Sequence, residues 1–251
     1  MKTFSLLQES LTQSISRLDL EAAIKDVGSL ARADCAKLQR EMYGIVVSAL
    51  TYQEALAFQI ALQKHQFPTA IVADLDVPLL HDSFQIQGLK RKEDDLIFTN
   101  SMGKMMTRPL EDLVFIAAGF FDKLQIESKV THKIDRFAGR QIPRVLTERL
   151  SLERNELQFR IDFFFSSGPH RLHASLREDN VLFFHDISVR WKDIKVELGV
   201  LAMMRHWLPI ERLSMTLQDP SSGRIYPNLL SYEEEIRWHF HRATRRDESS
   251  I

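Results

Sequence analysis

The sequence predicts an α+β protein in which N-terminal helices precede a βαβ unit plus a hairpin, followed by an antiparallel sheet packed on C-terminal helices. Residues 43–80 hold two apolar runs separated by an amphipathic stretch, the pattern of strand, helix and strand. Residues 157–165 alternate in polarity with the period of a strand. Residues 193–209 and 231–243 space their apolar side chains as helices do.

Composition narrows the class of protein. The chain has 251 residues, 44% of them hydrophobic, with 33 basic and 34 acidic residues. A net charge of -1 provides no bulk attraction to nucleic acid or anionic membranes. Cys35 is the single cysteine and fits a reducing compartment. The N-terminus lacks the features of a signal peptide, and the longest uncharged apolar run, Leu113–Phe121, is too short to span a bilayer. We expect a cytoplasmic protein.

The pattern of apolar and charged residues divides the chain into four segments. They are a helical N-terminal segment (1–42), a βαβ plus hairpin module (43–125), a basic connecting segment (126–155), and an antiparallel sheet with helices (156–251). The helices of the first segment would cover a sheet edge or recruit a partner.

The second segment begins with a strand, and Thr51 with Glu54 then forms a capping box that starts a helix. Leu56 and Ile60 lie one turn apart, and we expect them to face the sheet. The strand-to-helix turn contains no glycine, which argues against a Rossmann or P-loop site. Asp74 and Asp76 follow the second strand, where open α/β sheets bind ligands, although ordinary polar loops also occur there.

The stretch "GIVVSALTYQEALAFQIALQKHQFPTAIVADLDVPLL", a short hairpin and "PLEDLVFIAAGFF" follow one another. This succession resembles an uncharacterised family of intracellular bacterial proteins. Its βαβ half is similar to the module known as the putative signal-transducing protein. The resemblance implies a fold and transfers no catalytic residue.

The third segment is rich in basic residues, with acidic residues among them. Two interpretations stay open, a solvated linker and a groove for phosphates. A groove for nucleic acid normally has several aromatic side chains, and Phe137 is the single aromatic residue here. The basic residues are Lys129, Lys133, Arg136, Arg140, Arg144, Arg149 and Arg154.

The fourth segment brings polar residues onto one sheet face. If Phe165 pairs with His170, His173 lies opposite Asp162. The candidate ligand site is then Arg160, Asp162, Arg171 and His173. Sheet decoration is the alternative, in which case removing the Asp162 carboxylate would cost little stability. A serine–histidine–aspartate triad is not expected, because the nearby serine lies in the middle of a strand.

The last helix is predicted to start at Tyr232, after a capping box at Ser231. Its histidines, His239 and His241, lie about 200° apart around the helix and cannot bind one metal ion. Trp238, Arg242 and Arg245 point away from the predicted buried stripe. They are a candidate partner surface unless another element covers the tryptophan.

No metalloprotease, redox, hydrolase or phosphate-loop motif occurs, so the sequence predicts no catalytic residue, metal or cofactor. The leading prediction is a non-enzymatic intracellular module that binds another protein, a second copy of itself or a small anionic ligand. The alternative is an enzyme acting on a phosphorylated or anionic substrate.

Overall fold

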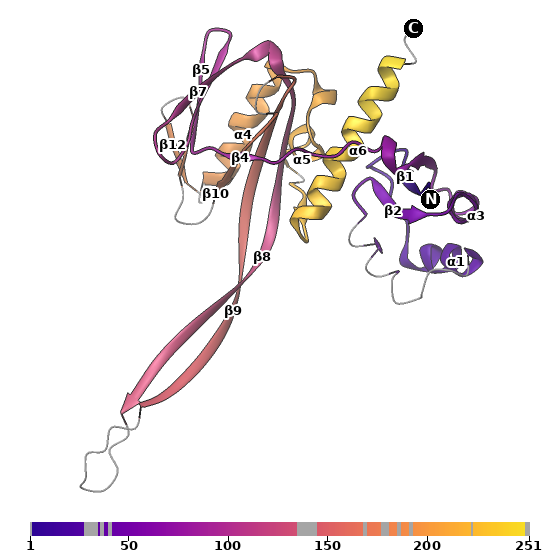
Figure 1. Cartoon of the computed structure of the whole chain (residues 1–251), viewed down its shortest axis with the longest axis horizontal. Helices are drawn as coiled ribbons and strands as arrows, with labels where there is room; N and C mark the ends of the chain where they lie inside the picture. The colour runs from indigo at the N-terminus through magenta and orange to yellow at the C-terminus, as the bar shows by residue number, and fades with distance from the viewer. Residues whose placement is uncertain are drawn as a thin grey trace, which may run out of the picture.

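The protein is an α+β structure with three sheets, seen here in a computed structural model (Figure 1). The structure describes residues 2–27, 35, 38–39, 42–134, 145–167, 170–176, 181–184, 187–190, 193–221 and 223–248.

The N-terminal unit is a three-stranded sheet with two helices on one face. The strand order is β2-β1-β3, and β1 is antiparallel to both neighbours. The expected βαβ unit is therefore present as β2, α3 and β3, but a strand from the predicted helical segment lies between its two strands. The elements are β1 (Phe4–Gln8), α1 (Arg17–Val27), β2 (Ile45–Leu50), α3 (Tyr52–Lys64) and β3 (Thr69–Ala73).

Helix α3 begins as the sequence predicts. The Thr51 hydroxyl accepts a hydrogen bond from the Glu54 N–H, and the Glu54 carboxylate accepts one from the Thr51 N–H. The prediction for its buried face is wrong. Leu56 and Ile60 are exposed, while the helix packs through Ala55, Phe58, Ala61 and Leu62. The stripe that is covered thus contains two small alanines and the large Phe58, and it lies beside the stripe of Leu56 and Ile60.

The central sheet has five strands in the order β13-β8-β9-β10-β4. The pairs β8–β9 and β9–β10 are antiparallel, while the short edge strands β13 and β4 run parallel to their neighbours. Its members are β4 (Phe84–Gln85), β8 (Leu113–Ile134), β9 (Val145–Phe165), β10 (Arg171–Leu176) and β13 (Ile225–Tyr226).

The third sheet has the order β12-β11-β5-β6-β7 and combines the predicted hairpin with a later one. Its strands are β5 (Gly88–Lys92), β6 (Asp95–Thr99), β7 (Met105–Pro109), β11 (Val181–Phe184) and β12 (Ile187–Arg190). The C-terminal helices are α4 (Ile194–Met204), α5 (Met215–Gln218) and α6 (Leu229–Glu248). Single 3-10 turns occur at Asp74–Asp76, Leu110–Asp112, Arg205–Trp207 and Ile210–Arg212.

Strands β8 and β9 extend far beyond the central sheet as a two-stranded ribbon, which Figure 1 shows leaving the body. Their pairing continues in one register from Ile116 and Phe163 to Ile134 and Val145. We call the outer part, residues 122–134 and 145–156, the arm. Thirteen residues of strand span roughly 40 Å. The predicted connecting segment is thus not a linker in its described residues, because they form paired strands.

The two predicted modules also share their sheets. The predicted module 43–125 contains the inner part of β8, yet this strand pairs with β9 of the last segment. Strand β5 of the first module pairs with β11 of the last. A large core lies between the central and third sheets and includes Leu198 of α4. The boundaries predicted at 125 and 156 therefore do not separate the packed units.

Helix α6 lies between the N-terminal unit and the central sheet (Figure 1). Tyr232 and Ile236 pack on the central sheet with Phe164. Trp238 packs on the other side, against the N-terminal sheet. The helix starts at Leu229, three residues before the predicted start, because Asn228 Oδ1 accepts the Ser231 N–H at 2.9 Å and acts as the cap.

Gly44 permits this packing. Its φ is +93°, and a Cβ atom at this position would lie 2.6 Å from Cβ and Cγ of Trp238. Gly103 has a similar φ of +75°, but a Cβ atom there would meet no described atom within 4 Å beyond its own chain neighbours.

We expect Gly44→Ala to destabilise the protein by about 2–5 kcal/mol, since backbone strain adds to overpacking. Gly103→Ala, the matched control, carries only the backbone strain and should cost about 1–2 kcal/mol. Urea denaturation of both variants measures the difference. Equal losses would show that the contact between Gly44 and Trp238 does not limit the packing.

Candidate functional site

The predicted pairing of β9 and β10 is confirmed. The Phe165 N–H donates to the His170 carbonyl at 2.9 Å, His173 lies opposite Asp162, and Ser175 lies opposite Arg160. The four polar residues predicted as a ligand site therefore do come together on one face of the central sheet.

Asp162 is the centre of this cluster and is fully buried. Arg160 donates to it through Nε at 2.7 Å and Nη2 at 3.0 Å, and Arg171 donates through Nε at 2.7 Å. The hydroxyl of Tyr232, on α6, donates at 2.9 Å. The carboxylate thus joins β9, β10 and α6, and its two oxygens accept four hydrogen bonds.

The charges around Asp162 are matched. Burial alone would raise the pKa of this carboxyl, but Arg160 and Arg171 outweigh burial and lower the pKa below its usual 3.8. Arg171 donates on to Glu233 at 2.7 Å, and Arg160 to Ser83 Oγ at 3.1 Å. This arrangement gives Asp162 a structural role, so the expectation that its removal costs little stability is reversed.

The carboxylates after β3 have separate surroundings. Asp74 is half-buried and accepts a hydrogen bond from the Ser5 hydroxyl of β1. Asp76 is exposed, and its backbone carbonyl accepts a hydrogen bond from His241 Nδ1 at 3.2 Å. Both contacts join parts of the fold, and a ligand-binding role for these residues remains a prediction.

Trp238 is covered, which corrects its assignment to a partner surface. It is 9% exposed, and its Nε1 donates to the Gln8 carbonyl at 2.6 Å. Arg242 is half-buried, with its guanidinium 5.7 Å from the centre of the Trp238 ring. The side chain of Arg245 lies outside the described part of the structure.

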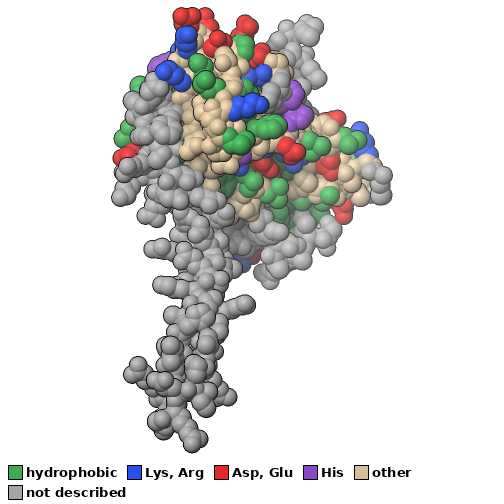
Figure 2. All heavy atoms as spheres, turned by 60° about the vertical axis from the view of Figure 1, so that its left-hand side comes forward, with side chains coloured by type: hydrophobic (Ala, Val, Ile, Leu, Met, Phe, Trp, Pro, Cys, Tyr) green, Lys and Arg blue, Asp and Glu red, His purple; other side chains and the backbone are tan. Residues whose placement is uncertain are grey.

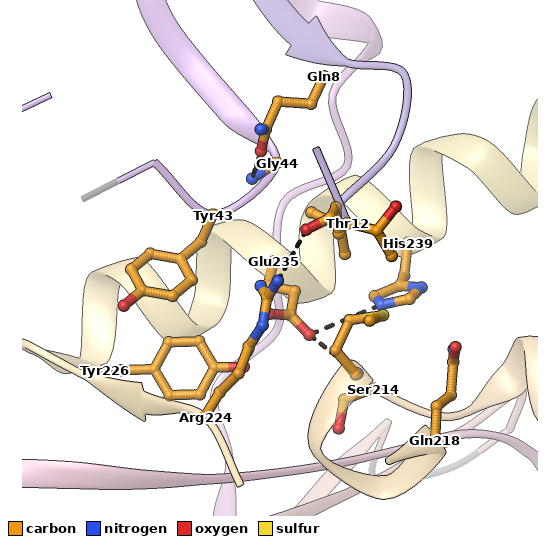
Figure 3. A network of polar contacts seen from close by, with 12 residues as sticks. Gln8, Thr12, Tyr43, Gly44, Ser214, Gln218, Arg224, Tyr226, Glu235 and His239 are labelled. Atoms are coloured by element: carbon orange, nitrogen blue, oxygen red, sulfur yellow. Dashed lines mark hydrogen bonds and ion pairs between the residues drawn. The ribbon is translucent and has the colours of Figure 1, made fainter. Parts of the chain in front are cut away.

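A second buried carboxylate, Glu235, was not singled out from the sequence (Figure 3). It accepts hydrogen bonds from Arg224 Nη1 and the Tyr226 hydroxyl, each at 2.8 Å, and from the Met215 N–H at 3.1 Å. The His239 ring lies 3.7 Å away. Burial acts to raise the pKa of Glu235, but His239 and Arg224 outweigh it and lower the pKa.

One signal in the sequence could have found Glu235. It is the third of three consecutive glutamates, and on a helix it lies three residues after Tyr232 and one before Ile236, beside the buried stripe. A glutamate at such a position needs partners, but the sequence does not show that Arg224 and Tyr226 provide them.

Within the described ranges, no group of three or more histidine, cysteine, aspartate or glutamate residues could hold a metal ion. Nor is any helix among them long and apolar enough to cross a membrane. Comparison with known protein families, curated proteins and solved structures finds no match.

We expect Asp162→Ala to destabilise the protein by about 3–5 kcal/mol, because it leaves the buried Arg171 without its main partner. Asp95→Ala, an exposed control on β6, should change stability by at most about 0.5 kcal/mol. Urea denaturation measures both free energies. A loss below about 1 kcal/mol for Asp162→Ala would contradict the structural role.

His173 should make stability depend on pH. Burial, followed by the charge of Arg160, lowers its pKa from 6.5 to about 4. The unfolded chain takes up this proton near 6.5 and the folded chain only near 4, so stability is lost as the pH falls through that window.

The expected loss is on the order of 2 kcal/mol after allowance for solvent screening. Replacing the imidazole in His173→Asn should remove this part of the pH dependence, whereas His206→Asn, at an exposed position, should leave it unchanged. Denaturation curves collected from pH 7 to pH 4 test this, and identical profiles for His173→Asn and the unaltered protein would contradict it.

Proposed function

We propose that this chain is a non-enzymatic binding module that associates with another protein molecule through the arm, and that a second copy of the chain is the first partner to test. The observation that carries the proposal is the arm itself. Beyond Phe121 and Phe159, strands β8 and β9 pair only with each other in the part of the chain that the structure describes.

An isolated two-stranded ribbon is marginally stable in water. Each of its strands also presents an outer edge of backbone N–H and C=O groups, to which another strand can be added. The sequence of the arm contains apolar residues at intervals, namely Leu124, Ile126, Val130, Ile134, Val145, Leu146, Leu150 and Leu152. A protein surface that pairs with an edge or covers a face would stabilise the ribbon.

The described arm carries no excess charge that would attract a polyanion, while Arg136, Arg140 and Arg144 of the predicted basic segment lie outside the described residues. The basic residues of the arm are Lys123, Lys129, Lys133, Arg149 and Arg154, and its acidic residues are Asp122, Glu127, Glu148, Glu153 and Glu156, so the two signs cancel. On the face of the body seen in Figure 2, acidic and basic side chains also intermingle over the described surface.

A second copy fits this charge pattern. The β8 part of the arm has three basic and two acidic residues, and the β9 part has two basic and three acidic residues. The two strands therefore carry opposite small net charges, and β8 of one copy is complementary to β9 of another.

The alternative of an enzyme acting on an anionic substrate gains no support from the Asp162 cluster, because Asp162 and Arg171 are both buried and bonded to each other. The single cysteine, Cys35, is buried and suits the cytoplasmic setting that we propose.

Shortening the arm tests the proposal. Leu124 and Asn155 are partners in the ladder, so replacing residues 125–154 with Asn-Gly closes the ribbon with a two-residue turn and keeps the central sheet. We expect the full chain to self-associate in sedimentation velocity. The shortened chain should remain monomeric and should still unfold cooperatively in urea, which shows that the central sheet is kept.

Affinity capture with the full and shortened chains extends the test to other proteins. The proposal is refuted if the full chain is monomeric and recovers no protein that the shortened chain fails to recover. Self-association that persists in the shortened chain would assign it to another surface.

A further inference from the structure

A cavity of about 500 Å³, lined by both polar and apolar side chains, lies where the N-terminal unit meets the rest of the protein. Its size falls in the range of small-molecule sites. Residues that follow β1 form one wall, Gln39, Met42 and Tyr43 form another, and Arg224, just before β13, forms a third. The lining residues are Gln8, Leu11, Thr12, Gln13, Ser14, Ile15, Gln39, Met42, Tyr43 and Arg224.

The described lining combines one cationic side chain with uncharged polar groups. Arg224 is the charged residue among these ten, and no carboxylate belongs to the described lining. The amides of Gln8, Gln13 and Gln39 and the hydroxyls of Thr12 and Ser14 add uncharged donors and acceptors. Such a wall disfavours a cation and an entirely apolar ligand, while the guanidinium favours an anion.

Arg224 is held in place by two hydrogen bonds. Its Nη1 donates to Glu235 at 2.8 Å, and its Nη2 donates to the Leu11 carbonyl at 2.8 Å. A guanidinium has five N–H donors, and these bonds use two of them. Its side chain is 25% exposed, and its guanidinium lies 5.8 Å from the centre of the Tyr43 ring.

The buried carboxylate of Glu235 fixes the orientation of the Arg224 guanidinium before any ligand binds. Its hydrogen bonds with Tyr226 and the Met215 N–H hold the carboxylate, and the carboxylate in turn orients Arg224 (Figure 3). A guanidinium positioned in advance loses little conformational freedom when an anion binds to it.

We propose that this cavity binds a small organic anion, whose carboxylate or phosphate pairs with Arg224 and whose uncharged polar groups contact the amides and hydroxyls of the lining. The ligand would touch both the N-terminal unit and the segment that carries Arg224. Binding therefore stabilises the packing of the N-terminal unit on the rest of the protein, because a ligand that binds only the folded state shifts the unfolding equilibrium.

The test uses four probes with the full chain: inorganic phosphate, a sugar monophosphate, a nucleoside monophosphate and citrate. We expect at least one organic probe to raise Tm and to bind measurably in isothermal titration calorimetry. Citrate distinguishes a carboxylate from a phosphate requirement, and inorganic phosphate shows whether the anion alone is sufficient.

Two variants locate the binding. Arg224→Met should lower the affinity for the organic probe by roughly 10- to 100-fold, the usual effect of losing charged hydrogen bonds. Because Arg224 also pairs with Glu235, a second variant, Ser14→Phe, fills the cavity from an exposed position and should abolish binding without touching that pair.

The controls are Arg212→Met and Ser101→Phe, which make the same changes at exposed positions outside the lining and should bind as the unaltered protein does. The proposal is overturned if no organic probe binds, or if a probe binds Arg224→Met and Ser14→Phe as tightly as it binds the unaltered protein. Neither result depends on the arm, so this inference and the proposed association can fail separately.

Discussion

The arrangement of the protein depends on how α6 is held between two sheets. A helix in such a position buries polar as well as apolar residues, and buried polar groups destabilise a fold unless they find partners. Tyr232 reaches Asp162 on the central sheet, and Glu235 meets Tyr226 and Arg224 at its edge. On the opposite side, Trp238 donates to the backbone of β1. The helix is thus held by specific polar anchors on both sides, in addition to its apolar contacts.

These anchors relate the two functional proposals to one another. The pair of Glu235 and Arg224 holds α6 and at the same time orients a guanidinium toward a cavity. The arm leaves the same central sheet on which α6 packs, since β8 and β9 carry Phe115 and Phe164. A body held rigidly by buried ion pairs is a suitable base for a projecting ribbon, because the ribbon depends on its inner half for register.

Much of the local structure could be predicted from the sequence. The pairing of Phe165 with His170, and with it the position of His173 opposite Asp162, followed from the alternation of two strands and a short turn. The capping box at Thr51 was also correct. The predictions that were wrong concern which face of a helix is buried. Leu56 and Ile60 satisfy a helical period but are exposed, and Trp238 lies off the predicted buried stripe but is covered. The spacing of apolar residues alone does not show which face of a helix packs on a sheet, nor whether two faces of the same helix are covered.

The sequence by itself determined the α+β class, most helices and strands, and the polar cluster on β9 and β10, because these features arise from residues close together in the chain. Only the tertiary structure decided that β1 lies between β2 and β3, that β8 and β9 form one long ribbon, and that Glu235 meets Arg224 beside a cavity. These features need contacts between distant segments, and such contacts are selected by the packing of the whole chain and not by local periodicity.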